Sequence, residues 1–179
     1  MPFDKQPTLT GERLLLRPLR ADDYDAIYAA AADPLIWEQH PANNRHEPAV
    51  FKALFDESLA SGGALVAIDR ATGRMIGWSR YHGYDDAASE VEIGWTFLAR
   101  AYWGGVYNGE MKQLMLAHAF RTVRTVLFVV GTGNVRSQRA VEKLGGIRRR
   151  EVRVNANGGE SYVYELTADT YAAAKAVIP

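Results

Sequence analysis

Cysteine is absent from the 179 residues of the chain, so disulfide bonds and thiolate zinc sites are excluded. The chain also lacks net charge, because 21 basic residues balance 21 acidic ones. A neutral chain has no overall positive field to attract nucleic acid or an anionic membrane. No apolar run approaches the roughly 18 residues of a membrane-spanning helix, and the first residues contain no apolar segment of the signal-peptide type. These absences predict a cytoplasmic protein without a nucleic-acid or membrane partner.

The chain does contain enough apolar side chains to build a core. Apolar residues make up 47% of the sequence, within the ordinary range of globular proteins. A chain of 179 residues fits one domain, and no repeat, linker or low-complexity segment divides it. We therefore expect residues 1–179 to form a single domain.

The spacing of apolar residues predicts an α/β fold. Residues 125–130, Thr-Val-Leu-Phe-Val-Val, form an almost continuous apolar run, as in a parallel strand covered on both faces, and they follow a strand and a long helix. That order predicts one parallel β-α-β crossover in a mixed, mostly antiparallel central sheet of about seven strands, flanked by helices. The expected strands cover residues 13–19, 64–69, 74–82, 89–98, 125–130, 147–154 and 161–166. The expected helices cover 23–32 (with Asp22 as N-cap), 49–60, 110–120, 134–144 and 168–177.

Residues 91–120, around which the chain is organised, comprise a strand, an aromatic and glycine-rich turn, and a helix. The turn contains Gly104, Gly105 and Gly109. The first N–H groups of a helix have no partner within the helix, and the helix dipole there favours an anion. Glycine lets a ligand approach the backbone closely. The turn is therefore a candidate phosphate site, although the same glycines also suit an ordinary turn.

The strand over residues 89–98 carries candidate catalytic carboxylates. Its alternation predicts a polar face of Glu90, Glu92, Gly94 and Thr96, opposite an apolar face of Val91, Ile93, Trp95 and Phe97. Because the strand leads into the crossover, it should be central in the sheet. A carboxylate on a central strand near a cleft gains a raised pKa through desolvation, which suits a general base. The alternative is a half-solvated sheet face.

The helix expected over residues 134–144 begins with two candidate ligand contacts. Ser137 shares one helix face with Ala140, Val141 and Leu144. It therefore continues the face expected to point into the protein toward the start of the helix. Its hydroxyl either meets a ligand or hydrogen-bonds within its own helix. Asn134, just before the helix, is first of all an N-cap candidate.

Three further patterns do not support a site of their own. Gly131 and Gly133 follow a strand and open a helix, but Arg136 replaces the third glycine of a dinucleotide fingerprint. The arginines of residues 148–153 are expected on the solvated side of a late strand, with one of them available to a ligand phosphate. No metal site is expected, because the histidines lack ligand spacing. They are His40, His46, His82 and His118.

Two motifs resemble those of the GNAT N-acetyltransferases. Residues 103–110, Trp-Gly-Gly-Val-Tyr-Asn-Gly-Glu, look like the family's loop for the pyrophosphate of acyl-CoA. Residues 134–145 resemble the family's Asn-x-x-Ser…Glu-Lys-x-Gly helix. This second motif is the more specific one, and it is closest to the branch that acetylates the N-termini of ribosomal proteins. The order of elements matches the family over nearly the whole chain.

The resemblance implies acetyl-CoA as the acyl donor, bound where the strands of Trp95 and Phe128 splay apart. The pantetheine would pair with the backbone of Phe97 and Leu98 and would touch Asn134. The pyrophosphate would lie on backbone amides of the turn. These amides belong to Gly104, Gly105, Val106, Tyr107, Asn108 and Gly109.

The resemblance also implies direct transfer of the acetyl group. Glu92 matches the strand carboxylate that takes the acceptor's proton through water in many members, Ser137 would lie near the sulfur, and backbone N–H groups of the central strand would stabilise the oxyanion. Two features depart from the family's pattern. The usual Arg/Gln-x-x-Gly-x-Gly/Ala has Ala101 at its first position and Val106 at its last. Val141 replaces the tyrosine that protonates the departing thiolate, so Ser137 or water must serve.

The acceptor is expected on the other side of the cleft, against the loop of residues 37–46 and neighbouring strands. Trp37, Trp78 and Tyr81 are the expected substrate contacts, and acidic groups are few in these segments. A polycation would need several carboxylates to replace its hydration. We therefore expect a single primary amine beside an apolar or neutral group, at a peptide N-terminus or in a small molecule.

The sequence thus predicts an acetyl-CoA-dependent N-acetyltransferase. The competing hypothesis is a non-catalytic acyl-CoA-binding module of the same fold, which the altered glycine loop leaves open. A monomer and a homodimer are both compatible with the sequence.

Overall fold

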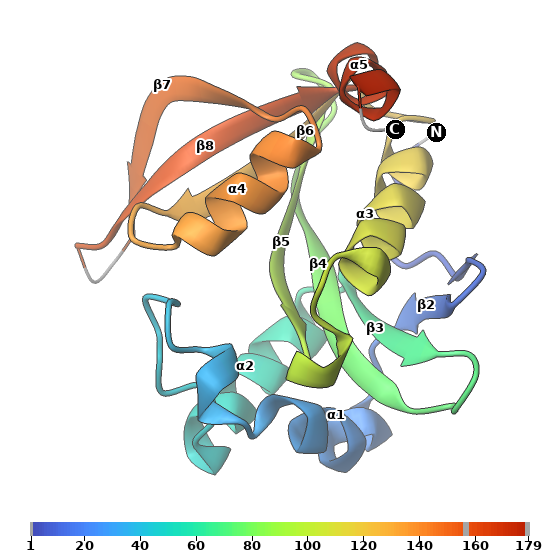
Figure 1. Cartoon of the computed structure of the whole chain (residues 1–179), viewed down its shortest axis with the longest axis vertical. Helices are drawn as coiled ribbons and strands as arrows, with labels where there is room; N and C mark the ends of the chain where they lie inside the picture. Colours follow the sequence, from blue (N-terminus) through green and yellow to red (C-terminus); the bar gives the residue numbers. More distant parts are fainter. Residues whose placement is uncertain (1, 156–157, 178–179) are drawn as a thin grey trace.

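The computed structural model describes residues 2–155 and 158–177. Within these residues, eight strands form one sheet in the order β1-β2-β3-β4-β5-β6-β8-β7 (Figure 1). The strands are β1 (Leu9–Thr10), β2 (Leu14–Pro18), β3 (Ala64–Asp69), β4 (Met75–Asp85), β5 (Glu90–Leu98), β6 (Thr125–Gly131), β7 (Ile147–Val154) and β8 (Glu160–Thr167). The helices are α1 (Tyr24–Ala31), α2 (Pro48–Ala60), α3 (Val106–Ala119), α4 (Val135–Lys143) and α5 (Ala168–Val177), with short 3-10 turns η1 (Ala21–Asp23), η2 (Pro34–Ile36) and η3 (Arg100–Tyr102).

Among the described strands, one neighbouring pair is parallel. β5 and β6 run in the same direction and are connected through α3, whereas the other pairs are antiparallel. The expected mixed sheet with one parallel crossover is confirmed. The additional strand, β1, has only two residues, so it is too short to produce a periodic pattern in the sequence.

Helices cover both faces of the sheet, and each face has its own core. α3 and α4 contribute Met111, Met115 and Val141 to the first core. α1 and α2 pack Ile27, Phe51 and Phe55 over the second core. Neighbouring strand residues point alternately into the two cores, which explains why the central strands are apolar on both faces.

A bulge in β5 reverses the expected alternation from Trp95 onward. Trp95 has a φ angle of +53°, and β5 contains one extra residue relative to β4 at this point. Phe97 therefore lies in the α1–α2 core with Trp95 packed against it, whereas Val91 and Ile93 lie in the α3 core. The prediction that these four side chains share a face is wrong, because alternation holds only along an unbroken ladder. The bulge places Trp95 on the same face as Glu92.

Two helix starts differ from those expected. Asp23, rather than Asp22, is the residue before α1, but its side chain makes no cap hydrogen bond to that helix. Its carboxylate instead accepts the Arg20 N–H at 2.8 Å, across the turn η1. α3 begins at Val106, four residues earlier than the expected start at residue 110. An interior glycine costs a helix about 1 kcal/mol. Helix propensity therefore predicts a start after Gly109 and misses the first turn of α3.

The three aromatic residues expected to line the acceptor site are instead core residues. Trp78 and Tyr81 are each 1% exposed, and Trp37 is 3% exposed. The Tyr81 hydroxyl donates to the Met115 carbonyl at 2.7 Å, and the Trp37 indole donates to the Ala31 carbonyl at 2.8 Å. Since the rings are buried and these polar atoms are satisfied within the protein, their assignment as substrate contacts is not retained.

Replacing Trp78 with alanine should therefore affect stability. Its ring stacks on Phe51 with centroids 5.3 Å apart, so removing it leaves a large cavity. We expect Trp78→Ala to lower the free energy of unfolding by roughly 3–5 kcal/mol, measured in urea. Trp103→Ala is the matched control, because Trp103 is 40% exposed and should cost much less. A loss below about 1 kcal/mol in Trp78→Ala would contradict the buried position.

Candidate active site

β5 and β6 pair only briefly and then separate, as Figure 1 shows. Beyond this short ladder, β5 continues to pair with β4 and β6 continues to pair with β8. The facing edges of β5 and β6 are thus unpaired along an opening in the described sheet. The splay expected between the strands of Trp95 and Phe128 is present. The parallel partners are Glu90 with Thr125, Val91 with Val126, and Glu92 with Leu127.

The start of α3 presents free backbone amides beside this opening. Gly104 and Gly105 have φ angles of +109° and +106°, a region that favours glycine, and Gly105 is the N-cap of α3. The first three N–H groups of α3 have no intrahelical partner. The Gly109 amide is different, because it donates to the Gly105 carbonyl at 2.7 Å. The anion site therefore comprises the amides of residues 105–108 at the helix start, with the Gly104 amide as a further proposed contact, and the expected contribution of the Gly109 amide is not retained.

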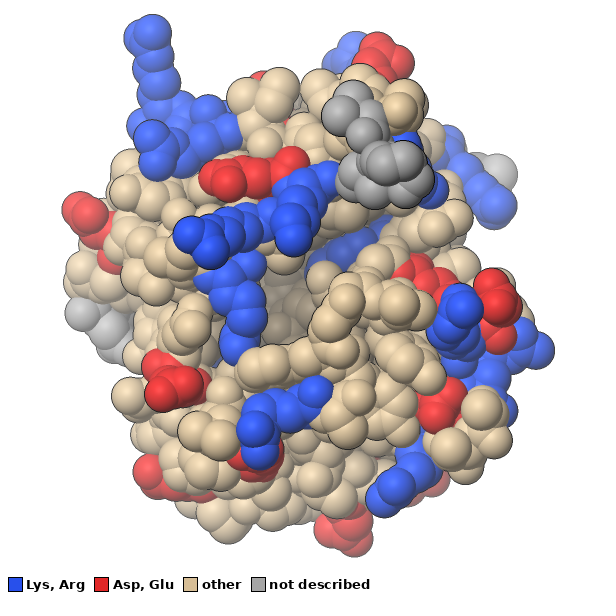
Figure 2. Space-filling model, in the orientation of Figure 1, with Lys and Arg blue, Asp and Glu red and all other residues tan. Residues whose placement is uncertain are grey.

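The space around this turn is open. An added Cβ at Gly104, Gly105 or Gly109 would meet no atom within 4 Å. Figure 2 shows that this face of the molecule is hollowed at its centre and that basic side chains lie along the upper and left rim of the hollow. Free amides, open space and nearby positive charge together suit a phosphate-bearing ligand.

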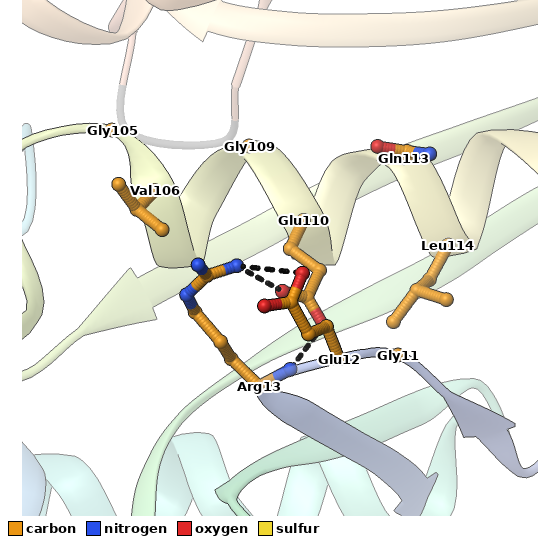
Figure 3. Close-up of a pocket in the computed structure, with 9 residues that line it drawn as sticks. All are labelled: Gly11, Glu12, Arg13, Gly105, Val106, Gly109, Glu110, Gln113 and Leu114. Atoms are coloured by element: carbon orange, nitrogen blue, oxygen red, sulfur yellow. Dashed lines mark hydrogen bonds and ion pairs between the residues drawn. The ribbon is translucent and has the colours of Figure 1, made fainter.

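A second hollow, of about 410 Å³, lies beside the first turns of α3 (Figure 3). Glu110 forms its floor, accepting the Arg13 backbone N–H at 2.8 Å and lying 3.7 Å from the Arg13 guanidinium. Neither Glu92 nor Ser137 is among its lining residues. It is lined by Gly11, Glu12, Arg13, Gly105, Val106, Gly109, Glu110, Gln113 and Leu114.

Trp103 and Arg136 bridge one end of the opening. The Trp103 indole donates to the Leu98 carbonyl at 2.9 Å. The Arg136 guanidinium lies 4.1 Å above the Trp103 ring and donates to the Ile36 carbonyl at 3.2 Å. The Leu98 carbonyl, expected to pair with pantetheine, is therefore occupied by Trp103, while Phe97 remains at the edge of the opening.

Glu92 lies on β5 at the last paired residue before the strands separate. Its side chain is 12% exposed, and one carboxylate oxygen lies 3.4 Å from the Arg153 guanidinium. Burial raises the pKa of Glu92 above its ordinary value, and the charges of Arg153 and Arg80 partly offset that effect. A carboxylate with a raised pKa is better matched to accepting a proton near neutral pH.

Three side chains that sequence analysis did not place near Glu92 lie beside it in the structure, namely Arg80, His82 and Trp95. Arg80 stacks on Trp95, with its guanidinium carbon 3.7 Å from the ring centre. His82 pairs in register with Glu92 and contacts Trp95 edge-on at 5.1 Å. An arginine inside the largely buried strand β4 is the sequence signal that could have identified Arg80.

The start of α4 lies on the other side of the opening from Glu92. Asn134 is 7% exposed and caps α4, because its side-chain oxygen accepts the Ser137 N–H at 3.1 Å. Ser137 is half-buried in the first turn. Val141 lies in the α3 core, whereas Glu92 points to the α1–α2 face. The proposed base and Ser137 thus approach the gap from opposite faces of the sheet.

Comparison with protein families matches residues 13–147 to the acetyltransferase (GNAT) domain. The chain belongs to the GNAT family. Comparison with curated proteins gave no match.

Solved structures of the family share this fold. A GCN5-related N-acetyltransferase from Brucella melitensis is 20% identical, with a TM-score of 0.81 over 98% of this chain and 85% of that one. An acetyltransferase (GNAT family) from Bacillus anthracis is 19% identical, with a TM-score of 0.73 over 91% and 99%. RimJ from Mycobacterium smegmatis, solved in complex with CoA-disulfide, is 20% identical, with a TM-score of 0.64 over 87% and 82%.

Family membership supports acetyl transfer with acetyl-CoA as the donor. In the part of the chain that is described, no three His, Asp or Glu side chains cluster in a way that could hold a metal ion. None of the described helices is both long and apolar enough to cross a bilayer.

Proposed function

We propose that this GNAT protein is an N-acetyltransferase that transfers an acetyl group from acetyl-CoA directly to a primary amine. We propose that it acts as a single domain over residues 1–179, in the cytoplasm, as a monomer or homodimer. The observation that most directly supports this proposal is the position of Glu92, a carboxylate of raised pKa at the point where β5 and β6 separate. A peptide or protein N-terminus, or a small-molecule amine, is the proposed acceptor.

In the proposed mechanism, each part of the chain has one task. The amides of residues 105–108 hold the pyrophosphate, and the edge of β5 at Phe97 orients the pantetheine. Acetyl-CoA supplies the thioester that the amine attacks. Glu92 takes the proton from the amine, directly or through one water, so that its lone pair is free to attack. Ser137, or a water beside it, gives a proton to the departing thiolate.

One observation favours the second candidate, a non-catalytic acyl-CoA-binding module. The Leu98 carbonyl is occupied by Trp103, and Arg136 ties Trp103 to Ile36 across the opening. A donor that extends along β5 must displace this contact. Thiol release from acetyl-CoA with a panel of peptides and small amines separates the two candidates. Turnover with an amine supports the enzyme, and tight acetyl-CoA binding without turnover supports the module.

Gly105→Glu should weaken acetyl-CoA binding. Its φ angle of +106° disfavours a side chain, and the added carboxylate would lie next to the pyrophosphate. We expect roughly a tenfold or greater increase in the Kd for CoA, measured by calorimetry, because a like charge and a displaced amide act together. Gly73→Glu is the control, since Gly73 also has a positive φ angle, +71°, but lies in the β3–β4 turn. Equal Kd values for both variants would refute the assigned anion site.

A further inference from the structure

A cluster of charged side chains lies beside Glu92, and the proposed mechanism leaves most of it unused. Arg80 donates to Glu57 at 3.0 Å, and Arg153 lies 3.4 Å from Glu92. Arg45 is close enough to Arg80 and Glu57 for both charges to affect its pKa. Arg153 also donates to Glu151 at 2.8 Å, so three positive charges face three negative ones, and the net charge becomes +1 when Glu92 carries a proton. Arginine donors that are not matched by a carboxylate suit an anionic ligand.

Arg80 is the most deeply buried member of this cluster. Its side chain is 3% exposed and is held between Trp95 and Glu57. Its Nε is buried and has no hydrogen-bond partner among the residues that the structure describes. Burying a charged donor without an acceptor is costly. A ligand oxyanion that reached Arg80 would complete this set of hydrogen bonds.

Arg45 is a second cation without a carboxylate in contact, within the described chain. Its guanidinium lies 3.1 Å from His40 Nε2 and 5.7 Å from the centre of the Trp37 ring. Burial and the charge of Arg45 lower the pKa of His40 to about 4, so His40 is neutral at pH 7 and adds no charge. Burial lowers the pKa of Arg45 to about 10, which still leaves it charged at pH 7.

From these contacts we infer that the acceptor carries a carboxylate close to its amine, and that Arg80 binds this carboxylate with help from Arg45. The inference rests on the proposed N-acetyltransferase function and names its substrate class. Arg80 pairs in register with Gly94, and Gly94 is roughly 7 Å along the strand from Glu92. That spacing suits an amine and a carboxylate separated by a few bonds. A free amino acid and a peptide that begins with an acidic residue both present this chemistry.

This substrate class replaces the neutral neighbour expected from the sequence. That expectation rested on Trp37, Trp78 and Tyr81, whose rings belong to the core. The planar guanidinium of Arg80 can instead hold a carboxylate through two parallel N–H···O bonds. The carboxylates of the cluster already pair with its arginines, so they offer few partners to a polyamine, and the exclusion of polycations is retained for this different reason.

Matched acceptors test the inference. One arm compares peptide amides that begin with Asp and with Asn, and the other compares alanine with alaninamide at equal concentrations of free amine. Thiol release is measured at saturating acetyl-CoA. Because charge-assisted hydrogen bonds discriminate strongly, we expect the carboxylate partner in at least one arm to have a KM lower by roughly 10- to 100-fold. The arm with the larger ratio identifies the source of the carboxylate.

Variants of Arg80 and Arg45 test whether these residues cause the preference for an acceptor that carries a carboxylate. We expect Arg80→Gln and Arg45→Gln each to reduce the KM ratio between paired acceptors toward one. Arg45→Gln keeps the test decisive if Arg80→Gln does not fold, since Arg45 is only half-buried. The control is Arg121→Gln, because Arg121 is exposed after α3 and should leave the ratio unchanged.

Equal KM values within both pairs for the unmodified protein would overturn the inference, as would an unchanged ratio in both cluster variants. Absence of thiol release with every amine would overturn the proposed function instead. In that case, calorimetry with CoA present decides the inference. Tighter binding of the carboxylate partner, lost in Arg45→Gln, supports it, and equal binding of both partners refutes it.

Discussion

Glu92→Gln should lower kcat by roughly 10²–10⁴, the usual contribution of a positioned general base. Glutamine keeps the size of the side chain and its reach toward Arg153, but it cannot take a proton from the amine. Affinity for acetyl-CoA should change little, since Glu92 lies on the α1–α2 face and the amides of residues 105–108 lie at the start of α3. Steady-state thiol release and calorimetry measure the two quantities separately.

The pH profile gives this prediction a second readout. Burial raises the pKa of Glu92, and the base acts in its deprotonated form, so kcat/KM should fall as pH drops through that raised pKa. The acidic limb should disappear in Glu92→Gln. Glu90→Gln is the matched control, because Glu90 lies on the same strand and its carboxylate pairs with Arg149. Full activity of Glu92→Gln from pH 6 to 9 would exclude Glu92 as the base and direct attention to His82.

Lys112→Met should stabilise the protein at and below neutral pH. Lys112 is 6% exposed in the core between α3 and the sheet, and its ammonium contacts the hydroxyls of Thr96 and Ser79 at 2.5 and 3.2 Å. Burial lowers its pKa from 10.5 to about 7. A tenfold change in proton affinity corresponds to about 1.4 kcal/mol, so burying the charged form costs roughly 5 kcal/mol. Losing two hydrogen bonds offsets roughly 1–3 kcal/mol, which leaves a net gain of roughly 2–4 kcal/mol.

The sign of the pH dependence follows from the lowered pKa of Lys112. Below pH 7 the lysine is protonated in both the folded and unfolded states, so the full penalty applies. Between about pH 7 and 10.5 the unfolded chain binds the extra proton, and stability rises with pH. Urea unfolding at pH 6, 7.5 and 9 should show this rise in the unmodified protein and its loss in Lys112→Met. Lys143→Met, an exposed change on α4, is the control. A Lys112→Met variant that is less stable at all three pH values would show that the hydroxyl contacts outweigh the buried charge.

The sequence predicts much of the fold because most elements are long and periodic. β3, β7 and α5 have the expected bounds, and the others differ mainly at their ends. The shift at the start of α3 follows from Gly109, which propensity places outside a helix although the Gly105 carbonyl accepts its amide. In the same way, Asp22 is the expected N-cap because the 3-10 turn η1, which places Asp23 directly before α1, is too short to be recognised from the sequence.

The site was predictable only where one residue or a local motif determines it. Glu92, the glycine turn and Asn134 occur at positions that the chain itself marks. The bulge at Trp95 depends on the register between β4 and β5, so alternation along β5 alone assigns Trp95 and Phe97 to the wrong face. Arg80 becomes visible beside Glu92 only after that register is known. The burial of Trp37 depends on where its loop packs, which local sequence does not determine.

An open sheet also exposes strand edges, which readily pair with strands of other chains. In this protein, side chains of the same molecule lie close to both strands at the gap between β5 and β6. The Trp103 indole occupies the Leu98 carbonyl on β5. At the end of β6, a Cβ at Gly131 would lie 2.8 Å from the ring of Pro41, so the loop of residues 37–46 packs over the strand there. A slender chain with few hydrogen-bonding groups can enter such a gap, whereas an incoming β-strand would meet Trp103 and Pro41 at its end.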